Sequence, residues 1–188
     1  ADLIELDVAG KIDARTQRGS FAGAIGIPQF MPGSILRYAV SAQSNQRIDL
    51  SNNFDDAILS VANFLVKHGW VKGLPIFAPV TPPTDAGKLV DGGLTPYLKW
   101  SELKAAGSEL IVATSAKNQA ADSPPNWQNY LMGVIDLPLP TQNTVKYLVG
   151  SPNFFVITQY NRSYFYATAV TELAQAIKQS MWNSGLEH

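Results

Sequence analysis

Apolar side chains recur at the 3.6-residue spacing of an α-helix in several stretches of the chain. The clearest stretch is "NFDDAILSVANFLVK", residues 53 to 67, which has acids at its start and a lysine at its end. The same spacing returns in "RSYFYATAVTELAQAIKQS", where Ser163 is suited to cap the helix. Shorter helices are expected over residues 3–8 and within "MPGSILRYA", with Ser34 as the cap of the latter. The pattern therefore predicts helices at both ends of the chain.

The pattern changes between about residues 75 and 160, where short runs rich in β-branched and aromatic residues alternate with Pro, Gly, Asp and Asn. Within this region we expect one short helix at "SELKAAG", from Ser101, and a loop at "KNQAADSPPNWQN". Helices before and after a block of strands are typical of an α+β fold and not of a wound parallel sheet. The predicted strands are "PIFAPV", "LIVAT", "YLMGVIDL", "TVKYLVG" and "NFFVITQY".

Length and composition indicate a folded protein with a sizeable core, because 46% of its 188 residues are hydrophobic. We predict a helical part made of residues 1–72 and 160–183 and a β-rich part of residues 73–159. The final residues, 184–188, read as the remnant of an expression tag.

Charge and cysteine content exclude several classes of function. The net charge is -1 and the 14 basic residues are scattered, so the chain has no basic stripe for nucleic acid. No apolar run reaches the roughly 18 residues of a membrane span, and no signal peptide is evident at the start. The absence of cysteine excludes disulfides and thiolate metal sites.

The stretch "GSFAGAIGIPQF", residues 19 to 30, concentrates glycine and alanine before a glutamine. It does not fit a phosphate loop, because no Lys-Ser or Lys-Thr follows. Small residues let the backbone approach an extended ligand, and the amide of Gln29 can both donate and accept hydrogen bonds to a sugar. The alternative is a tight packing seam between helices, which composition alone favours.

Several separated blocks resemble the lytic murein transglycosylase B family in order and spacing. They are "RGSFAGAIGIPQFMPGSILRYAV", "RIDL", "DDAILSVANFLVKHGW" and "ITQYNRSYFYATAV". The resemblance runs from about residue 10 to 180 and is dense over residues 19–70 and 156–170. It implies a lysozyme-like α+β fold and cleavage of the β-1,4 bond between N-acetylmuramic acid and N-acetylglucosamine in peptidoglycan.

The resemblance also implies a mechanism with a single glutamate in place of a pair of carboxylates. That glutamate acts first as acid and then as base, while the 6-hydroxyl of the sugar closes a 1,6-anhydro ring. In the family it lies on a helix before the glycine-rich block, so we expect no catalytic residue in this chain and a glutamate upstream of Ala1. The glutamates present read as solvated charges: Glu5, Glu102, Glu109 and Glu172.

Substrate-binding positions do carry over from the family. The tyrosines are expected to stack on sugar rings, although Tyr166 alone would read as a core residue of the last helix. Phe64 stands where many relatives have tyrosine, so stacking is retained and a hydroxyl contact is lost. For Arg162, contact with peptide carboxylates and a surface salt bridge both remain open. The substrate-binding residues implied are Ser20, Gln29, Phe30, Phe64, Tyr160, Asn161 and Tyr166.

Several relatives carry an EF-hand-like calcium loop between the positions of Val40 and Phe54. Here "SAQSNQRIDLSN" offers Ser41, Gln43 and Asn45 at the alternate positions, and no charged ligand at any of them. We therefore predict no metal and no cofactor, and interpret Asp49 as a loop or capping acid.

Two functions from different classes remain open on the sequence. The first is a lytic transglycosylase of the Gram-negative periplasm, acting on peptidoglycan strands and attached to the outer membrane through a lipid outside this chain. The second is a peptidoglycan-binding module without catalysis. A glutamate on a helix upstream would favour the enzyme.

Overall fold

The structure is a computed structural model of the chain and describes residues 2–43, 47–111 and 125–184. It divides into two compact units, Ala1–His68 and Gly69–His188. Within the described residues it has six α-helices and one antiparallel sheet of two strands, which confirms the predicted α+β class. The predicted grouping of residues 1–72 with 160–183 stays a prediction, and the tag remnant lies outside the described residues apart from Ser184.

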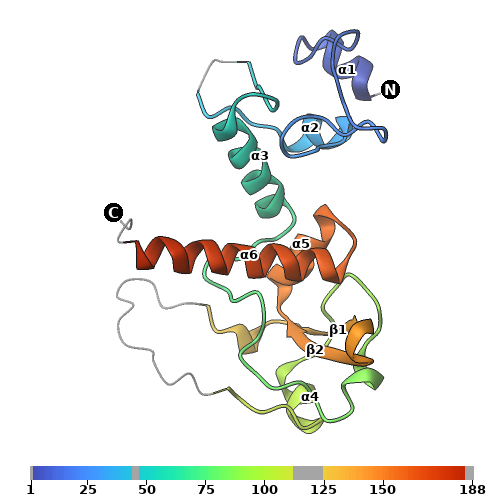
Figure 1. Ribbon diagram of the computed structural model, residues 1–188, viewed down its shortest axis with the longest axis vertical. Coiled ribbons are helices and arrows are strands. Elements are labelled where there is room, and N and C mark those ends of the chain that lie inside the picture. Colours follow the sequence, from blue (N-terminus) through green and yellow to red (C-terminus); the bar gives the residue numbers. More distant parts are fainter. Residues whose placement is uncertain (1, 44–46, 112–124, 185–188) are drawn as a thin grey trace. The chain divides into compact units, whose positions relative to one another are not determined.

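The first unit is helical (Figure 1). Helix α1 (Asp2–Val8) packs against α2 (Pro32–Tyr38), and α2 packs against α3 (Phe54–Lys67). Helix α3 confirms the strongest helical pattern of the sequence. Its cap is Asn53, whose side chain accepts hydrogen bonds from two backbone amides of the first turn, and such a cap stabilises a helix by about 1 kcal/mol.

The predicted cap of α2 is wrong. The helix begins at Pro32, after Met31, and Ser34 lies inside it. Proline has no N–H to satisfy and its φ is already helical, so it can start a helix at the first position without a side-chain cap.

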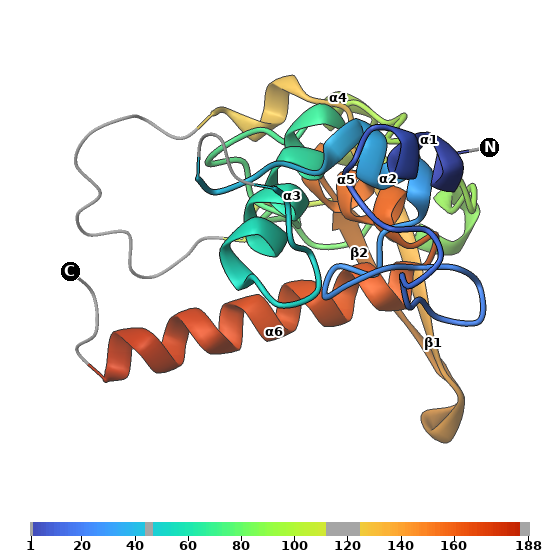
Figure 2. The same cartoon turned by 90° about the horizontal axis from the view of Figure 1, so that it is seen from above.

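The second unit is built around the antiparallel hairpin of β1 (Gly133–Leu139) and β2 (Thr144–Gly150). These strands confirm the predictions for "YLMGVIDL" and "TVKYLVG". The strands are joined by the 3₁₀ turn η3 (Pro140–Gln142), and Figure 2 shows η3 at the tip of the hairpin. Successive side chains of a strand point to opposite faces, so Val134 contributes to one apolar cluster and Ile135 to the other. The hairpin base is therefore covered on both faces.

The predicted strand "NFFVITQY" is wrong, because these residues form helix α5 (Pro152–Tyr160). Ser151 caps the helix by accepting the backbone N–H of Asn153 at 3.2 Å, and Pro152 occupies its first position. Residues 153–158 are all buried. A short helix buried all round has the same continuous apolar run as a buried strand, so periodicity cannot distinguish them.

The remaining elements surround this core. The run "PIFAPV" makes only isolated bridges and no strand, which corrects that prediction, while "LIVAT" and the loop "KNQAADSPPNWQN" fall partly outside the described residues. The predicted helices at "SELKAAG" and after Ser163 are confirmed. No helix in the described ranges is both long and apolar enough to cross a bilayer. The elements are η1 (Ala86–Leu89), α4 (Trp100–Ala105), η2 (Trp127–Asn129) and α6 (Tyr164–Asn183).

Candidate functional site

The glycine-rich segment 19–30 folds into two consecutive tight turns. In the first, the backbone N–H of Ser20 donates to Ala24 O at 2.8 Å, and Ser20 Oγ accepts from Ala24 N at 3.1 Å. In the second, Ile25 and Phe30 exchange two backbone hydrogen bonds of 2.8 and 3.1 Å. The segment is therefore a fixed scaffold, and Ser20 serves the first turn with its hydroxyl.

Gly26 is required by packing within the unit. Its φ is +71°, and a methyl group added there would overlap the carbonyl of Leu50. The packing explanation for the glycine content therefore holds at this position. Gly23 also has a positive φ, of +85°, but no atom lies within 4 Å of the place where its Cβ would be. The backbone at Gly23 is open to close approach.

Gln29 has a strained backbone, and a hydrogen bond fixes the orientation of its side chain. Its φ of 50° lies in the left-handed region, which costs a non-glycine residue roughly 1–2 kcal/mol. Both the backbone N–H and Nε2 of Gln29 donate to Gly26 O, at 3.0 and 2.8 Å. The side chain is exposed, and Oε1 accepts no hydrogen bond from any described residue. Strain of this kind concentrates at functional sites, and here it holds an acceptor toward solvent.

Phe30 and Phe64 belong to an aromatic group in the first unit. Their ring centroids are 6.0 Å apart, and Phe64 stacks on His68 at 3.9 Å. Tyr38 meets the edge of Phe64 at 4.9 Å, while Asn63 Nδ2 donates to Tyr38 O at 2.9 Å. These contacts join the end of the glycine-rich segment to α2 and α3.

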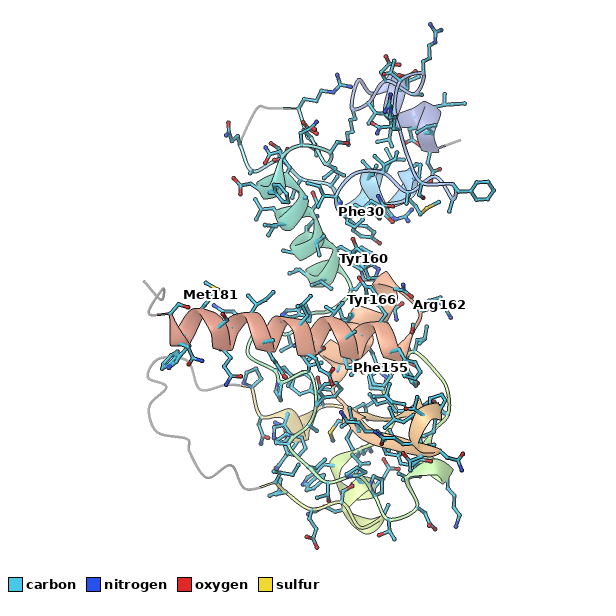
Figure 3. All side chains as sticks on the ribbon, in the orientation of Figure 1. Phe30, Phe155, Tyr160, Arg162, Tyr166 and Met181 are labelled. Atoms are coloured by element: carbon cyan, nitrogen blue, oxygen red, sulfur yellow. The ribbon has the colours of Figure 1, made fainter. Side chains whose placement is uncertain are left out.

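Tyr160 and Tyr166 lie together in the second unit, on either side of the turn between α5 and α6 (Figure 3). Asn161 follows Tyr160 at the end of α5. The rings of Tyr160 and Tyr166 are nearly parallel, with an interplanar angle of 6° and centroids 6.4 Å apart. Asn161 ends α5, and its carbonyl accepts from Ser163 N at 2.7 Å. Ser163 then caps α6 by accepting Tyr166 N at 3.3 Å, so the turn is hydrogen-bonded on both sides.

The phenol of Tyr160 is neutral at any physiological pH. Burial, and to a lesser extent the neighbouring Tyr166, raises its pKa to about 12. A neutral phenol can donate one hydrogen bond and accept others, which suits it to contact sugar hydroxyls.

No described glutamate has the surroundings of an acid–base catalyst. Such a group needs a pKa raised by an apolar site, whereas all four described glutamates are exposed. Glu102 accepts Lys99 N at 2.7 Å, and Glu172 pairs with Lys146 at 3.6 Å. Glu187 lies outside the described residues.

Asp56 has a role that the sequence pattern, which shows only two acids at a helix start, does not indicate. This carboxylate is 1% exposed and joins both ends of the loop that precedes α3. Asp56 Oδ1 accepts Ala42 N at 2.7 Å, and Oδ2 accepts Asp49 N at 2.8 Å. Ser60 adds a second tie, because its Oγ contacts the N and O of Val40 at 3.0 and 3.2 Å. Neither role could be predicted from local sequence, because the backbone partners of Asp56 and Ser60 lie 7 to 20 positions earlier in the chain.

Asp49 is a loop acid that closes the turn before α3, which is one of the two roles predicted for it. Its Oδ1 accepts the backbone N–H groups of Ser51 and Asn52 at 2.9 and 3.0 Å. The side chain of Asn52 donates to the same carboxylate, and this hydrogen bond is the main cause that lowers the pKa of Asp49. Among the described residues no group of three or more acidic or histidine side chains is placed to hold a metal. Asn45 lies outside them, and the absence of calcium stays a prediction.

The structure thus gathers the predicted residues into two groups. Gln29, Phe30 and Phe64 lie in the first unit, with Ser20 at the opening turn of the same segment. The second group lies in the other unit: Tyr160, Asn161 and Tyr166.

Comparison with known proteins identifies similar chains. The profile of the family described as "Transglycosylase SLT domain" matches residues 1–175. Membrane-bound lytic murein transglycosylase B of Escherichia coli (strain K12) is 38% identical over 165 residues, which is 88% of this chain and 41% of that protein. Soluble lytic transglycosylase SltB1 from Pseudomonas aeruginosa is 32% identical with a TM-score of 0.77, covering 95% of this chain and 55% of that one.

A third similar structure is the Escherichia coli lytic transglycosylase Slt35 in complex with calcium. It is 35% identical with a TM-score of 0.74 and covers 95% of this chain and 52% of that one. These matches confirm the predicted family and its lysozyme-like α+β fold. The chain spans about half the length of these relatives, or less.

Proposed function

The chain belongs to the transglycosylase SLT domain family, and from this premise we propose that it is part of a peptidoglycan lytic transglycosylase. The reaction is cleavage of the β-1,4 bond between N-acetylmuramic acid and N-acetylglucosamine, with formation of a 1,6-anhydromuramoyl end. The observation that carries the proposal is the family match over residues 1–175. This range includes both the glycine-rich segment and the turn between α5 and α6 with Tyr160, Asn161 and Tyr166, which we call the tyrosine turn.

In this proposal the chain supplies substrate-binding groups. Gln29 Oε1 accepts a hydrogen bond from an acetamido or hydroxyl group of the sugar, and its strained backbone keeps that oxygen in place. The open backbone at Gly23 allows the glycan to approach closely. The phenols of Tyr160 and Tyr166 donate to sugar oxygens while their rings cover apolar sugar faces.

The acid–base glutamate is proposed to come from sequence upstream of Ala1. It protonates the leaving oxygen, the acetamido group assists at the anomeric carbon, and the glutamate then takes the proton of the 6-hydroxyl as the ring closes. Support comes from the exposure of the four described glutamates, none of which lies in an apolar site.

The place of action in this proposal is the periplasm of a Gram-negative cell, where peptidoglycan is the partner. The membrane-bound relative of Escherichia coli supports it. A lipid anchor carried by sequence outside this chain stays a prediction.

The exposed glutamates also favour a second function for the isolated chain, namely peptidoglycan binding without catalysis. The experiment compares this chain with a version extended upstream by native sequence, each incubated with purified peptidoglycan. Mass spectrometry then measures released 1,6-anhydromuropeptides, and co-sedimentation measures binding.

Release by the extended version alone, with binding by both, is the expected result. Release by the short chain would place the catalytic acid within these residues and overturn the upstream assignment. Binding by both versions without any release would favour the binding module. Absence of both binding and release would refute the proposed function.

A further inference from the structure

A pocket of about 260 Å³ in the second unit is formed by residues that the proposed function does not use. Asp136 and Pro138 of β1 line it on one side, and Leu94 lines it from a loop. Arg162, from the turn before α6, and Phe165, from the first turn of that helix, complete the lining. Figure 3 shows Arg162 extending outward from this turn. Ligand pockets usually exceed about 300 Å³, so this one suits a group the size of an amino acid.

The walls of the pocket are held in place by hydrogen bonds within the unit. The hydroxyl of Tyr164 donates to Gly93 O, and Gln159 Nε2 donates to Leu94 O at 3.2 Å. Gly93 N in turn donates to Asp91 Oδ1 at 2.8 Å. The loop is therefore tied to α5 and to α6 before any ligand arrives, and such preorganisation lowers the entropic cost of binding.

The pocket holds two opposite charges that are not paired. Arg162 is exposed and Asp136 is half-buried, and neither forms an ion pair with any residue in the described ranges. Of the two roles that the sequence left open for Arg162, a salt bridge is thus absent from the described part of the chain. Both charges are available to a ligand.

This arrangement discriminates between ligand charges. A ligand with only a carboxylate would meet the carboxylate of Asp136, and a ligand with only an ammonium would meet Arg162. Burial is the main cause that raises the pKa of Tyr164 to about 12, and the nearby carboxylates of Asp91 and Asp136 raise it further, so the phenol adds no charge to the pocket. A ligand with both charges is attracted at each end.

We infer that this pocket binds the zwitterionic end of an amino acid. The guanidinium of Arg162 takes the carboxylate, Asp136 takes the ammonium, and Phe165 covers the adjoining carbon chain. The inference rests on the proposed function for its source: the peptides attached to the glycan of peptidoglycan, where a diamino acid residue retains one free amino and carboxylate end. A free amino acid carries the same chemistry, so the test separates the two sources.

The test measures affinity by isothermal titration calorimetry with the 188-residue chain. The three probes are a peptide-free disaccharide, the same disaccharide with a tripeptide ending in meso-diaminopimelate, and that tripeptide with its diaminopimelate carboxylates amidated. The variants are Arg162→Ala and Asp136→Asn. Arg15→Ala serves as a matched control, because Arg15 is exposed and lies in the other unit. Circular dichroism verifies that each variant is folded.

We expect the tripeptide probe to bind about tenfold more tightly than the peptide-free disaccharide, which is a modest gain for two charge-assisted contacts of which one, to Arg162, is exposed to solvent. Amidation, Arg162→Ala and Asp136→Asn should each remove this gain, whereas Arg15→Ala should retain it. A gain that persists in both variants, or no gain where the disaccharide does bind, overturns the inference and leaves the proposed function intact.

If no saccharide probe binds, the proposed function fails. The pocket is then tested by itself, with free meso-diaminopimelate as the probe. Shifts of the Gly92 and Gly93 amides in a nuclear magnetic resonance titration, lost in Arg162→Ala, would support a free amino acid as the source. No shift would overturn the pocket assignment.

Discussion

Replacing Asp56 should open the loop that precedes α3. Its carboxylate accepts two backbone N–H groups, of Ala42 and Asp49, at 2.7 and 2.8 Å, and is 1% exposed. Hydrogen bonds to a charged group contribute about 1.5–3 kcal/mol each, and water that reaches the opened loop returns part of the loss. We expect Asp56→Ala to lower the free energy of unfolding of the first unit by about 3 kcal/mol, and Asp56→Asn by about half of that, since one acceptor remains.

Native-state hydrogen exchange of α3 amides is the appropriate assay, because all four tryptophans lie in the second unit and fluorescence would not report on the first. Asp55→Ala is the matched control. Asp55 is exposed on the same helical turn, and its loss should cost only about 0.3–1 kcal/mol through the helix dipole. A loss at Asp56→Ala no larger than that at Asp55→Ala would refute the reasoning.

Three further predictions concern single sites. The free energy of unfolding should fall as the pH rises from about 10 to about 12, because the phenol of Tyr160 ionises near pH 10 in the unfolded chain and only near pH 12 in the folded one. Urea unfolding measures this fall, which should be smaller in Tyr160→Phe. Gly26→Ala should lower the free energy of unfolding by at least about 2 kcal/mol, because a positive φ adds to the overlap with Leu50. Gly23→Ala should lower it only by the roughly 1–2 kcal/mol of backbone strain, and chemical unfolding measures both. Micromolar calcium should leave the melting temperature unchanged, since the described residues of the loop 41–52 offer neutral oxygens or carboxylates already engaged; a rise would contradict the absence of a calcium site.

Local signals in the sequence were sufficient where the structure depends on neighbours along the chain. Helix α3 and the strands β1 and β2 follow from the apolar pattern and the residues that break it, whereas the cap Asn53 and the pairing of the two strands come from the structure. Helix α5 does not, because its burial on all sides removes the period that separates helix from strand. The Ser151-Pro152 pair was the available signal, and it indicates a helix start.

The candidate site divides in the same way. The resemblance supplied Gln29 and the tyrosine turn, but not the left-handed backbone of Gln29 or the use of its Nε2 within the turn. The pocket of Asp136 and Arg162 could not be predicted from the sequence either, because the two residues lie far apart along the chain and on separate elements. Pairing across such a separation is set by tertiary packing and leaves no local pattern.

Two of the predicted substrate-binding residues, Gln29 and Asn161, share one structural principle, which is that each lies on a turn held by hydrogen bonds to its neighbours. Gln29 stands on a turn closed by Gly26, and Asn161 stands between α5 and the cap Ser163. Gly26 and Ser163, which help to fix these turns, are not themselves proposed to contact the sugar. Turns can present polar groups to an extended ligand only when secondary structure fixes them, since otherwise ordering them would consume binding energy. Substitutions at Gly26 or Ser163 should therefore weaken glycan binding as a loss of preorganisation, with little change in the contacts that a bound complex makes.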